Sequence, residues 1–151
     1  MRHVFYCDTV GWLGSAGLLL LRLAVGAAFL FHGWPKIHHP LDWMDLMGPS
    51  HVPAVLQGLA ALAEFGGGMA LIVGLLTRLA SLGIATNMIV ALAMVHWPNH
   101  HPFVSSSQGG PSFELAAVYL ACAVVFLILG PGRFSLDALL FRGPIEEKPH
   151  A

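Results

Sequence analysis

The chain has 151 residues, of which 56% are hydrophobic and 10% are Lys, Arg, Asp or Glu. Because a soluble domain usually carries about a quarter charged residues, this composition excludes an ordinary soluble domain and indicates a membrane protein in contact with the lipid bilayer. The net charge of −1 offers no basic surface for nucleic acid, so a nucleic-acid-binding function is excluded as well.

Four apolar blocks follow one another along the chain, and each is close to the roughly 20 residues that a helix needs to cross the hydrocarbon core. In hydrocarbon the backbone must satisfy its own hydrogen bonds, and no block alternates polar and apolar residues as a strand would. Each block is therefore expected to be a helix. The expected helices cover residues 12–34, 53–76, 79–97 and 112–130.

A shorter element is expected after the last block. The sequence Gly130-Pro131-Gly132 breaks the fourth helix, and Ser135 can cap a short interfacial helix over about residues 135–141. The sequence therefore predicts an all-α integral membrane four-helix bundle, formed by one domain over residues 1–142. Residues 143–151 would form a cytoplasmic tail.

Most of the Lys and Arg residues flank the same side of the predicted bundle. They are Arg2, Arg78, Arg133, Arg142 and Lys148. Lys36 is alone on the opposite side. Because cytoplasmic loops are enriched in Lys and Arg, we predict a multi-pass protein of the cytoplasmic (inner) membrane with both termini in the cytoplasm. Residues 35–52 and 98–111 would then face outward.

The outward ends of the first and third expected helices are similar in sequence. Residues 32–40 read His-Gly-Trp-Pro-Lys-Ile-His-His-Pro, and residues 96–102 read His-Trp-Pro-Asn-His-His-Pro. This similarity favours a parallel repeat of two helical hairpins, related by an axis along the membrane normal. Chance, together with the chemistry that all membrane interfaces share, is the alternative explanation.

Three polar residues lie near the middle of the expected spans: Arg22, Glu64 and Asn87. Because an unpaired charge at that depth is costly, we expect Arg22 and Glu64 to form an ion pair inside the bundle, with Asn87 completing it. A buried ion pair is weak evidence for stability. The pair could therefore fix the helix register, or it could serve as a proton or substrate relay.

Titratable side chains also lie at or just beyond the outward helix ends. They are His32, Lys36, His96 and Glu114. A carboxylate beside imidazoles in a partly dry site can exchange protons near neutral pH. On an ideal helix, Asn87 and His96 point about 180° apart, so both can face the bundle axis only if the helix deforms near Pro98.

The outward segments carry most of the nine histidines. Imidazole is the commonest metal ligand, so neighbouring turns could bring four histidines together around a transition metal or a haem. The candidate ligands are His38, His39, His100 and His101. The alternative is that these interfacial histidines coordinate nothing.

Four motifs, in this order, resemble the DoxX family of small membrane proteins. They are an Arg-to-Lys pattern over residues 22–36, a Glu and glycine pattern over residues 64–78, the acidic residue Glu114, and a closing signature over residues 130–137. The resemblance implies a four-helix bundle. It also implies quinone-coupled oxidation of thiosulfate and thiols, or assemblies with sulfurtransferase and superoxide dismutase. The family positions that it carries over are Arg22, His32, Lys36, Glu64, Glu114, Arg133 and Asp137.

The resemblance and the polar residues together favour a membrane oxidoreductase subunit that holds a quinone beneath the outward face. The expected catalytic residues are His32, Glu114, Arg22 and Glu64, and the expected quinone contacts are His32, Lys36, His96 and Asn87. Electrons would come from a redox partner subunit or a bound cofactor. Two alternatives belong to other classes: a non-catalytic scaffold or accessory subunit, and a metal- or haem-binding protein that uses the outward histidines.

Overall fold

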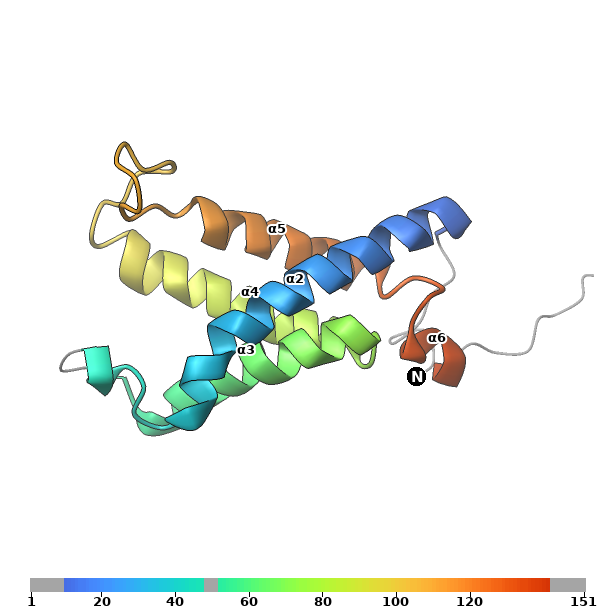
Figure 1. Ribbon diagram of the computed structural model, residues 1–151, viewed down its shortest axis with the longest axis horizontal. Helices are drawn as coiled ribbons and strands as arrows, with labels where there is room; N and C mark the ends of the chain where they lie inside the picture. The colour runs from blue at the N-terminus through green and yellow to red at the C-terminus, as the bar shows by residue number, and fades with distance from the viewer. Residues whose placement is uncertain (1–9, 48–51, 142–151) are drawn as a thin grey trace, which may run out of the picture.

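The structure, a computed structural model, describes residues 10–47 and 52–141 (Figure 1). These residues form helices and no strand, which confirms the all-α fold class. The elements are α2 (Trp12–His38), the 3-10 turn η1 (Asp45–Met47), α3 (Ala54–Val73), α4 (Thr77–Ala91), the π-helical turn η2 (Leu92–His96), α5 (Glu114–Leu129) and α6 (Leu136–Phe141). Arg2, His51, Arg142, Lys148 and the tail 143–151 lie outside the described residues.

Three helices of the described chain are long and apolar enough to cross a membrane: α2, α3, and α4 together with η2. The fourth, α5, is apolar but has 16 residues, which gives it a length of about 24 Å. Large apolar side chains such as Leu20, Leu62, Leu82 and Ile128 stay exposed along these helices. An exposed apolar surface of this extent is the surface that lipid covers.

The helix ends differ from the expected ones for local reasons. α2 continues through Pro35 to His38, because membrane helices tolerate a proline in their interior. α3 stops at Val73 because Gly74, with φ of 70°, adopts the left-handed conformation that ends a helix. α4 starts directly afterwards at Thr77, so α3 and α4 are joined by a tight turn.

The chain forms two helical hairpins, α2–α3 and α4–α5, and α3 packs against α4 between them. The described residues 39–47 and 52–53, between α2 and α3, lie at the same end of the molecule as the connection 97–113, and we call this the loop end (Figure 1). The tight turn 74–76 and α6 lie at the opposite end, the turn end. From that turn, α3 and α4 diverge toward the loop end.

Glycines allow α2 and α3 to approach closely. A Cβ atom added at Gly33 would lie 2.6 Å from the backbone nitrogen of Phe65, and one added at Gly68 would lie 2.8 Å from the carbonyl oxygen of Gly26. Small residues at such positions let membrane helices pack backbone to backbone. This contact fixes the position of the last turn of α2, which carries Lys36, relative to the middle of α3.

The turn end is held by polar bonds between segments that are distant in the sequence. The Asp137 carboxylate accepts hydrogen bonds from the backbone N–H groups of Leu76 (2.7 Å) and Thr77 (2.9 Å). These donors are at the start of α4, where backbone N–H groups have no partner within the helix. The hydroxyl of Ser135 accepts a bond from the N–H of Ala138 at 3.0 Å, which is the predicted cap of α6.

Candidate functional site

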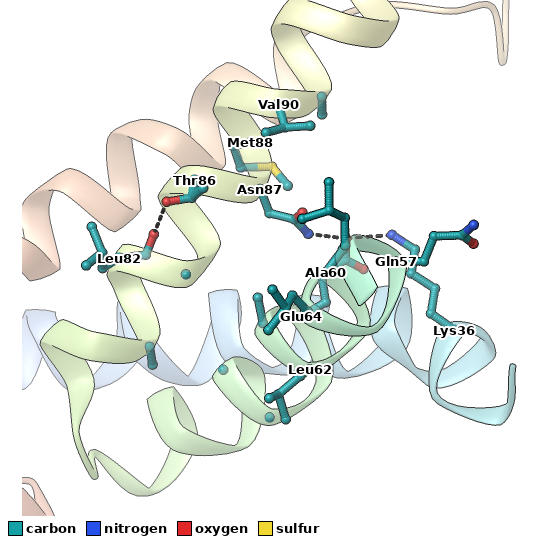
Figure 2. A pocket seen from close by; sticks show the side chains of 18 of the residues that line it. Lys36, Gln57, Ala60, Leu62, Glu64, Leu82, Thr86, Asn87, Met88 and Val90 are labelled. Atoms are coloured by element: carbon teal, nitrogen blue, oxygen red, sulfur yellow. Dashed lines mark hydrogen bonds and ion pairs between the residues drawn. The ribbon is translucent and has the colours of Figure 1, made fainter. Parts of the chain in front are cut away.

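Side chains from three helices meet at Glu64, near the middle of α3. Its Oε1 atom accepts a bond from Lys36 Nζ at 2.5 Å and a second from Asn87 Nδ2 at 2.8 Å (Figure 2). Lys36 belongs to the last turn of α2 and Asn87 to α4. The three residues therefore connect both hairpins through one carboxylate.

The second oxygen of the Glu64 carboxylate lacks a hydrogen bond. Glu64 is 4% exposed, and its Oε2 atom has no hydrogen-bond partner. An ionised carboxylate can only accept hydrogen bonds, and leaving a buried acceptor unpaired costs about 1–3 kcal/mol. The site therefore has an acceptor that a ligand carrying a donor would satisfy.

Glu64 opens onto an apolar groove between α3 and α4, with a volume of about 1110 Å³. Leu62, Leu82, Met88 and Val90 belong to its walls (Figure 2). Leu62, Leu82 and Val90 are themselves exposed at the molecular surface, so the groove opens sideways to the surrounding lipid. A molecule with a polar head and an apolar body could enter from the membrane and reach Glu64.

A short segment at the loop end covers the part of the groove around Lys36 and Glu64, which we call the head of the groove. The Trp43 ring lies against Lys36, with Nζ 4.2 Å from the ring centroid, which is a cation–π distance. The Trp43 indole N–H donates to the carbonyl oxygen of Gln57 at 3.1 Å. Both Trp43 and Gln57 line the groove.

The buried amide of Gln57 holds this segment in place. Gln57 is 1% exposed, and its Oε1 atom accepts a bond from the backbone N–H of Met44 at 2.9 Å. Its Nε2 atom donates to the Asp45 carboxylate at 3.3 Å and to the carbonyl oxygen of Val52 at 3.1 Å. Sequence reasoning missed Gln57, although its spacing of seven residues from Glu64, two helical turns, places both on one face of α3.

The predicted Arg22–Glu64 ion pair is wrong. Arg22 is fully buried, but its guanidinium donates to the carbonyl oxygens of Phe134 and Leu71, at the turn end. Leu71 is in the last turn of α3, and its carbonyl oxygen also accepts a bond from the N–H of the C-cap Gly74 at 3.2 Å. Glu64 instead pairs with Lys36, and Asn87, expected to complete the Arg22–Glu64 pair, donates to Glu64 alone of those two residues.

The sequence model of the DoxX family matches residues 17–97, more than half of the chain. This chain belongs to the DoxX family. All three residues of the Glu64 cluster fall inside the matched range. No solved structure matches the chain.

Relatives of this DoxX protein match most of the chain. The inner membrane protein YqjF of Escherichia coli is 30% identical over 128 residues, which are 85% of this chain and 95% of YqjF. A Bacillus subtilis protein named "Putative oxidoreductase CatD" is 27% identical over 127 residues, covering 84% of this chain and 89% of that protein. An uncharacterised membrane protein of Mycobacterium tuberculosis is 28% identical over 139 residues, covering 84% and 83% of the two chains.

The other predicted proton-exchanging residues of this DoxX protein lie outside the groove. His32 is exposed, and its ring faces the ring of Tyr119 at 6.1 Å. Glu114 is exposed at the start of α5. His96 Nδ1 lies 3.0 Å from His101 Nδ1, which makes a histidine pair at the loop end. The geometry therefore retains Lys36, Glu64 and Asn87 as one site and does not join His32, His96 or Glu114 to it.

The predicted metal ligands are not brought together. The His38 ring packs on Trp34, and His39 Nδ1 lies 3.8 Å from a carboxylate oxygen of Asp42. Over residues 10–47 and 52–141, no three or more His, Cys, Asp and Glu side chains are grouped as a metal site would need. His101 contacts His96, and His100 adopts a left-handed backbone conformation with φ of 50°. The expected set of His38, His39, His100 and His101 is therefore not assembled.

Proposed function

We propose that this DoxX protein is a membrane subunit that binds a quinone-type ligand in the groove between α3 and α4 and takes part in oxidoreduction of sulfur or thiol compounds. The observation that carries the proposal is the buried Glu64 oxygen without a hydrogen-bond partner, beside Lys36 and at the head of an apolar groove. The Lys36 donors suit the ring oxygens of such a ligand in either redox form, the unpaired Glu64 oxygen suits a ring hydroxyl of its reduced form, and the groove suits its apolar tail.

The residues present suit such a ligand. Lys36 Nζ has three donors, of which Glu64 takes one, so the others are available for a ligand oxygen. The Trp43 ring and the aliphatic side chains of the groove supply the apolar contact. A bound quinone would supply a two-electron, two-proton acceptor for oxidation of two thiols to one disulfide.

The chain's own residues would position the ligand and manage protons. Asn87 and Lys36 fix one oxygen of Glu64, which leaves the other directed to a ligand or a proton. With a ligand bound, the apolar walls would keep water from Glu64 and Lys36 and so strengthen the electrostatic interactions between them and the ligand. Electrons would come from a redox partner subunit, and the name of the relative CatD supports an oxidoreductase role.

Binding of a short-tailed ubiquinone to the purified protein tests the proposal. Gly83 lines the groove, and a Cβ atom there meets only Ala63, at an ordinary contact distance of 3.4 Å, so Gly83→Leu should fill the groove without unfolding the bundle. We expect ubiquinone affinity to fall about tenfold or more in Gly83→Leu and in Lys36→Met, which corresponds to about 1.4 kcal/mol or more.

The matched control is His32→Ala, which removes an exposed side chain outside the groove. Its ubiquinone affinity should equal that of the unaltered protein, while circular dichroism verifies that all variants are folded. Unchanged binding in Gly83→Leu would contradict the proposal. Absence of ubiquinone binding in the unaltered protein, with retention of a partner subunit, would instead favour the scaffold alternative.

A further inference from the structure

The two oxygens of the Glu64 carboxylate differ in their hydrogen bonds. Both donors that reach Glu64, from Lys36 and Asn87, go to Oε1, and Oε2 is left without a donor. The carboxylate cannot become a donor unless it is protonated. A ligand group that donates a hydrogen bond would therefore satisfy Oε2, whereas a ligand that has only acceptors would leave Oε2 without a partner.

The two redox forms of a quinone differ in this respect. The oxidised ring carries carbonyl oxygens, which only accept hydrogen bonds. The reduced ring carries hydroxyl groups, which donate and accept. A ring hydroxyl could donate to Glu64 Oε2 while its oxygen accepts from Lys36 Nζ, whereas a carbonyl oxygen could use Lys36 but would meet the carboxylate oxygen as a second acceptor.

The rest of the groove fits the tail of such a ligand. The groove follows α3 from its N-cap Pro53 to Ala70, a rise of about 25 Å, and Glu64 lies within it, six residues or about 9 Å from Ala70. On the turn-end side of Glu64 its lining includes small residues, which leave room for a chain. These are Gly66, Gly67, Ala70, Ala80 and Gly83. A polar head at Glu64 thus continues into an apolar slot that opens to lipid.

From this geometry, and resting on the proposed function, we propose that the groove binds the quinol form of its ligand more tightly than the quinone form. The preference arises from Glu64 Oε2, with Lys36 as the donor common to both forms. Hydrogen bonds to charged groups are stronger than those between neutral groups, and a buried charged group without a hydrogen-bond partner is unfavourable. We expect about tenfold or more tighter binding of the quinol, which would raise the midpoint potential of the bound two-electron couple by about 30 mV or more.

Anaerobic isothermal titration calorimetry of the purified full chain, with ubiquinone-1 and ubiquinol-1 as probes, tests this preference. The unaltered protein should bind ubiquinol-1 about tenfold or more tightly. In Glu64→Gln the carboxamide offers both a donor and an acceptor, so the ratio of the two affinities should fall to about one. Glu114→Gln, which alters an exposed carboxylate outside the groove, should keep the original ratio.

The outcomes separate this inference from the proposed function. Equal affinities in the unaltered protein, or tighter binding of ubiquinone-1, would overturn the quinol preference while leaving quinone binding intact. Failure of both probes to bind would overturn the proposed function itself. If Glu64→Gln does not fold, the ratio of the ubiquinol-1 and ubiquinone-1 affinities of the unaltered protein still tests the quinol preference, because that measurement requires no variant.

Discussion

The Lys36–Glu64 pair joins a partly buried lysine to a buried carboxylate, so each charge compensates the other. Their side chains are 19% and 5% exposed. Removal of one partner leaves the other charge uncompensated, which typically costs about 3–5 kcal/mol. We therefore expect Lys36→Met and Glu64→Gln each to destabilise the fold, and the double variant to be more stable than the sum of the single effects predicts.

Reversible unfolding in detergent measures this coupling, which should be about 0.5–3 kcal/mol. The control is Asp42→Asn, because the His39–Asp42 pair is more than half exposed on both sides and surface pairs contribute little. Additive effects of Lys36→Met and Glu64→Gln would show that the two side chains do not stabilise each other.

The sequence predicted which residues are polar within the bundle but not all of their partners. Counting residues from Trp34 placed Arg22 level with Glu64, because it assumed that the helices are upright and aligned at their ends. α2 in fact continues to His38, and its Lys36 reaches back to Glu64. The segment after α5 folds back at the turn end and offers Arg22 the Phe134 carbonyl oxygen, a backbone group that no side-chain pattern reveals.

At the scale of elements, the contact between α2 and α3 depends on glycine at particular positions. A methyl group at Gly33 would meet the backbone of Phe65, which cannot move independently of α3. Gly33→Ala should therefore push the two helices apart and destabilise the fold by about 1–3 kcal/mol. It should also displace Lys36, one turn away, and weaken ligand binding in the groove.

Gly17 is the matched control, since it is in the same helix and a Cβ atom there would meet nothing within 4 Å. Gly17→Ala should leave stability unchanged or raise it by up to about 1 kcal/mol, because alanine favours the helix. Equal thermal unfolding midpoints for Gly33→Ala and Gly17→Ala would show that the close approach does not matter.

The end of α4 shows how far helical periodicity predicts the directions of its side chains. An ideal helix would direct Asn87 and His96 to opposite sides, so a shared site required a deformation near Pro98. The structure contains one, the π-helical turn Leu92–His96. It leaves Val95 lining the groove, but His96 contacts His101 rather than the groove. The helix is therefore deformed close to where a shared site would require it, yet His96 still lies outside the groove.

At the scale of the whole molecule, the fold followed from the cost of polar groups in hydrocarbon. That cost accounts for the four apolar helices and for the interruptions between them. It does not determine how each helix is rotated about its axis, since all faces are apolar and small differences in packing decide. For this reason the sequence identified the bundle and the residues Glu64, Lys36 and Asn87, whereas the groove and the Trp43–Gln57 cover emerged only from the structure.

The orientation of the molecule in the membrane decides which compartment the head of the groove adjoins. Lys36 is in the last turn of α2, toward the loop end, whereas Arg78 is in the first turn of α4, at the turn end, so the positive-inside rule predicts that the loop end lies outside the cytoplasm. In a variant lacking Cys7 and Cys122, a cysteine introduced by Ser106→Cys should react with a membrane-impermeant maleimide in intact spheroplasts. One introduced by Lys148→Cys should react only after the membrane is opened.

The reverse labelling pattern would place the head of the groove on the cytoplasmic side and overturn the predicted topology. The distinction bears on the proposed chemistry, because it sets the compartment from which a sulfur donor or partner subunit could approach Glu64. Ser106 is exposed in the connection 97–113, so slow labelling there cannot result from burial within the chain. Labelling of Ser106→Cys from outside would therefore direct the search for the redox partner to the outer face of the membrane.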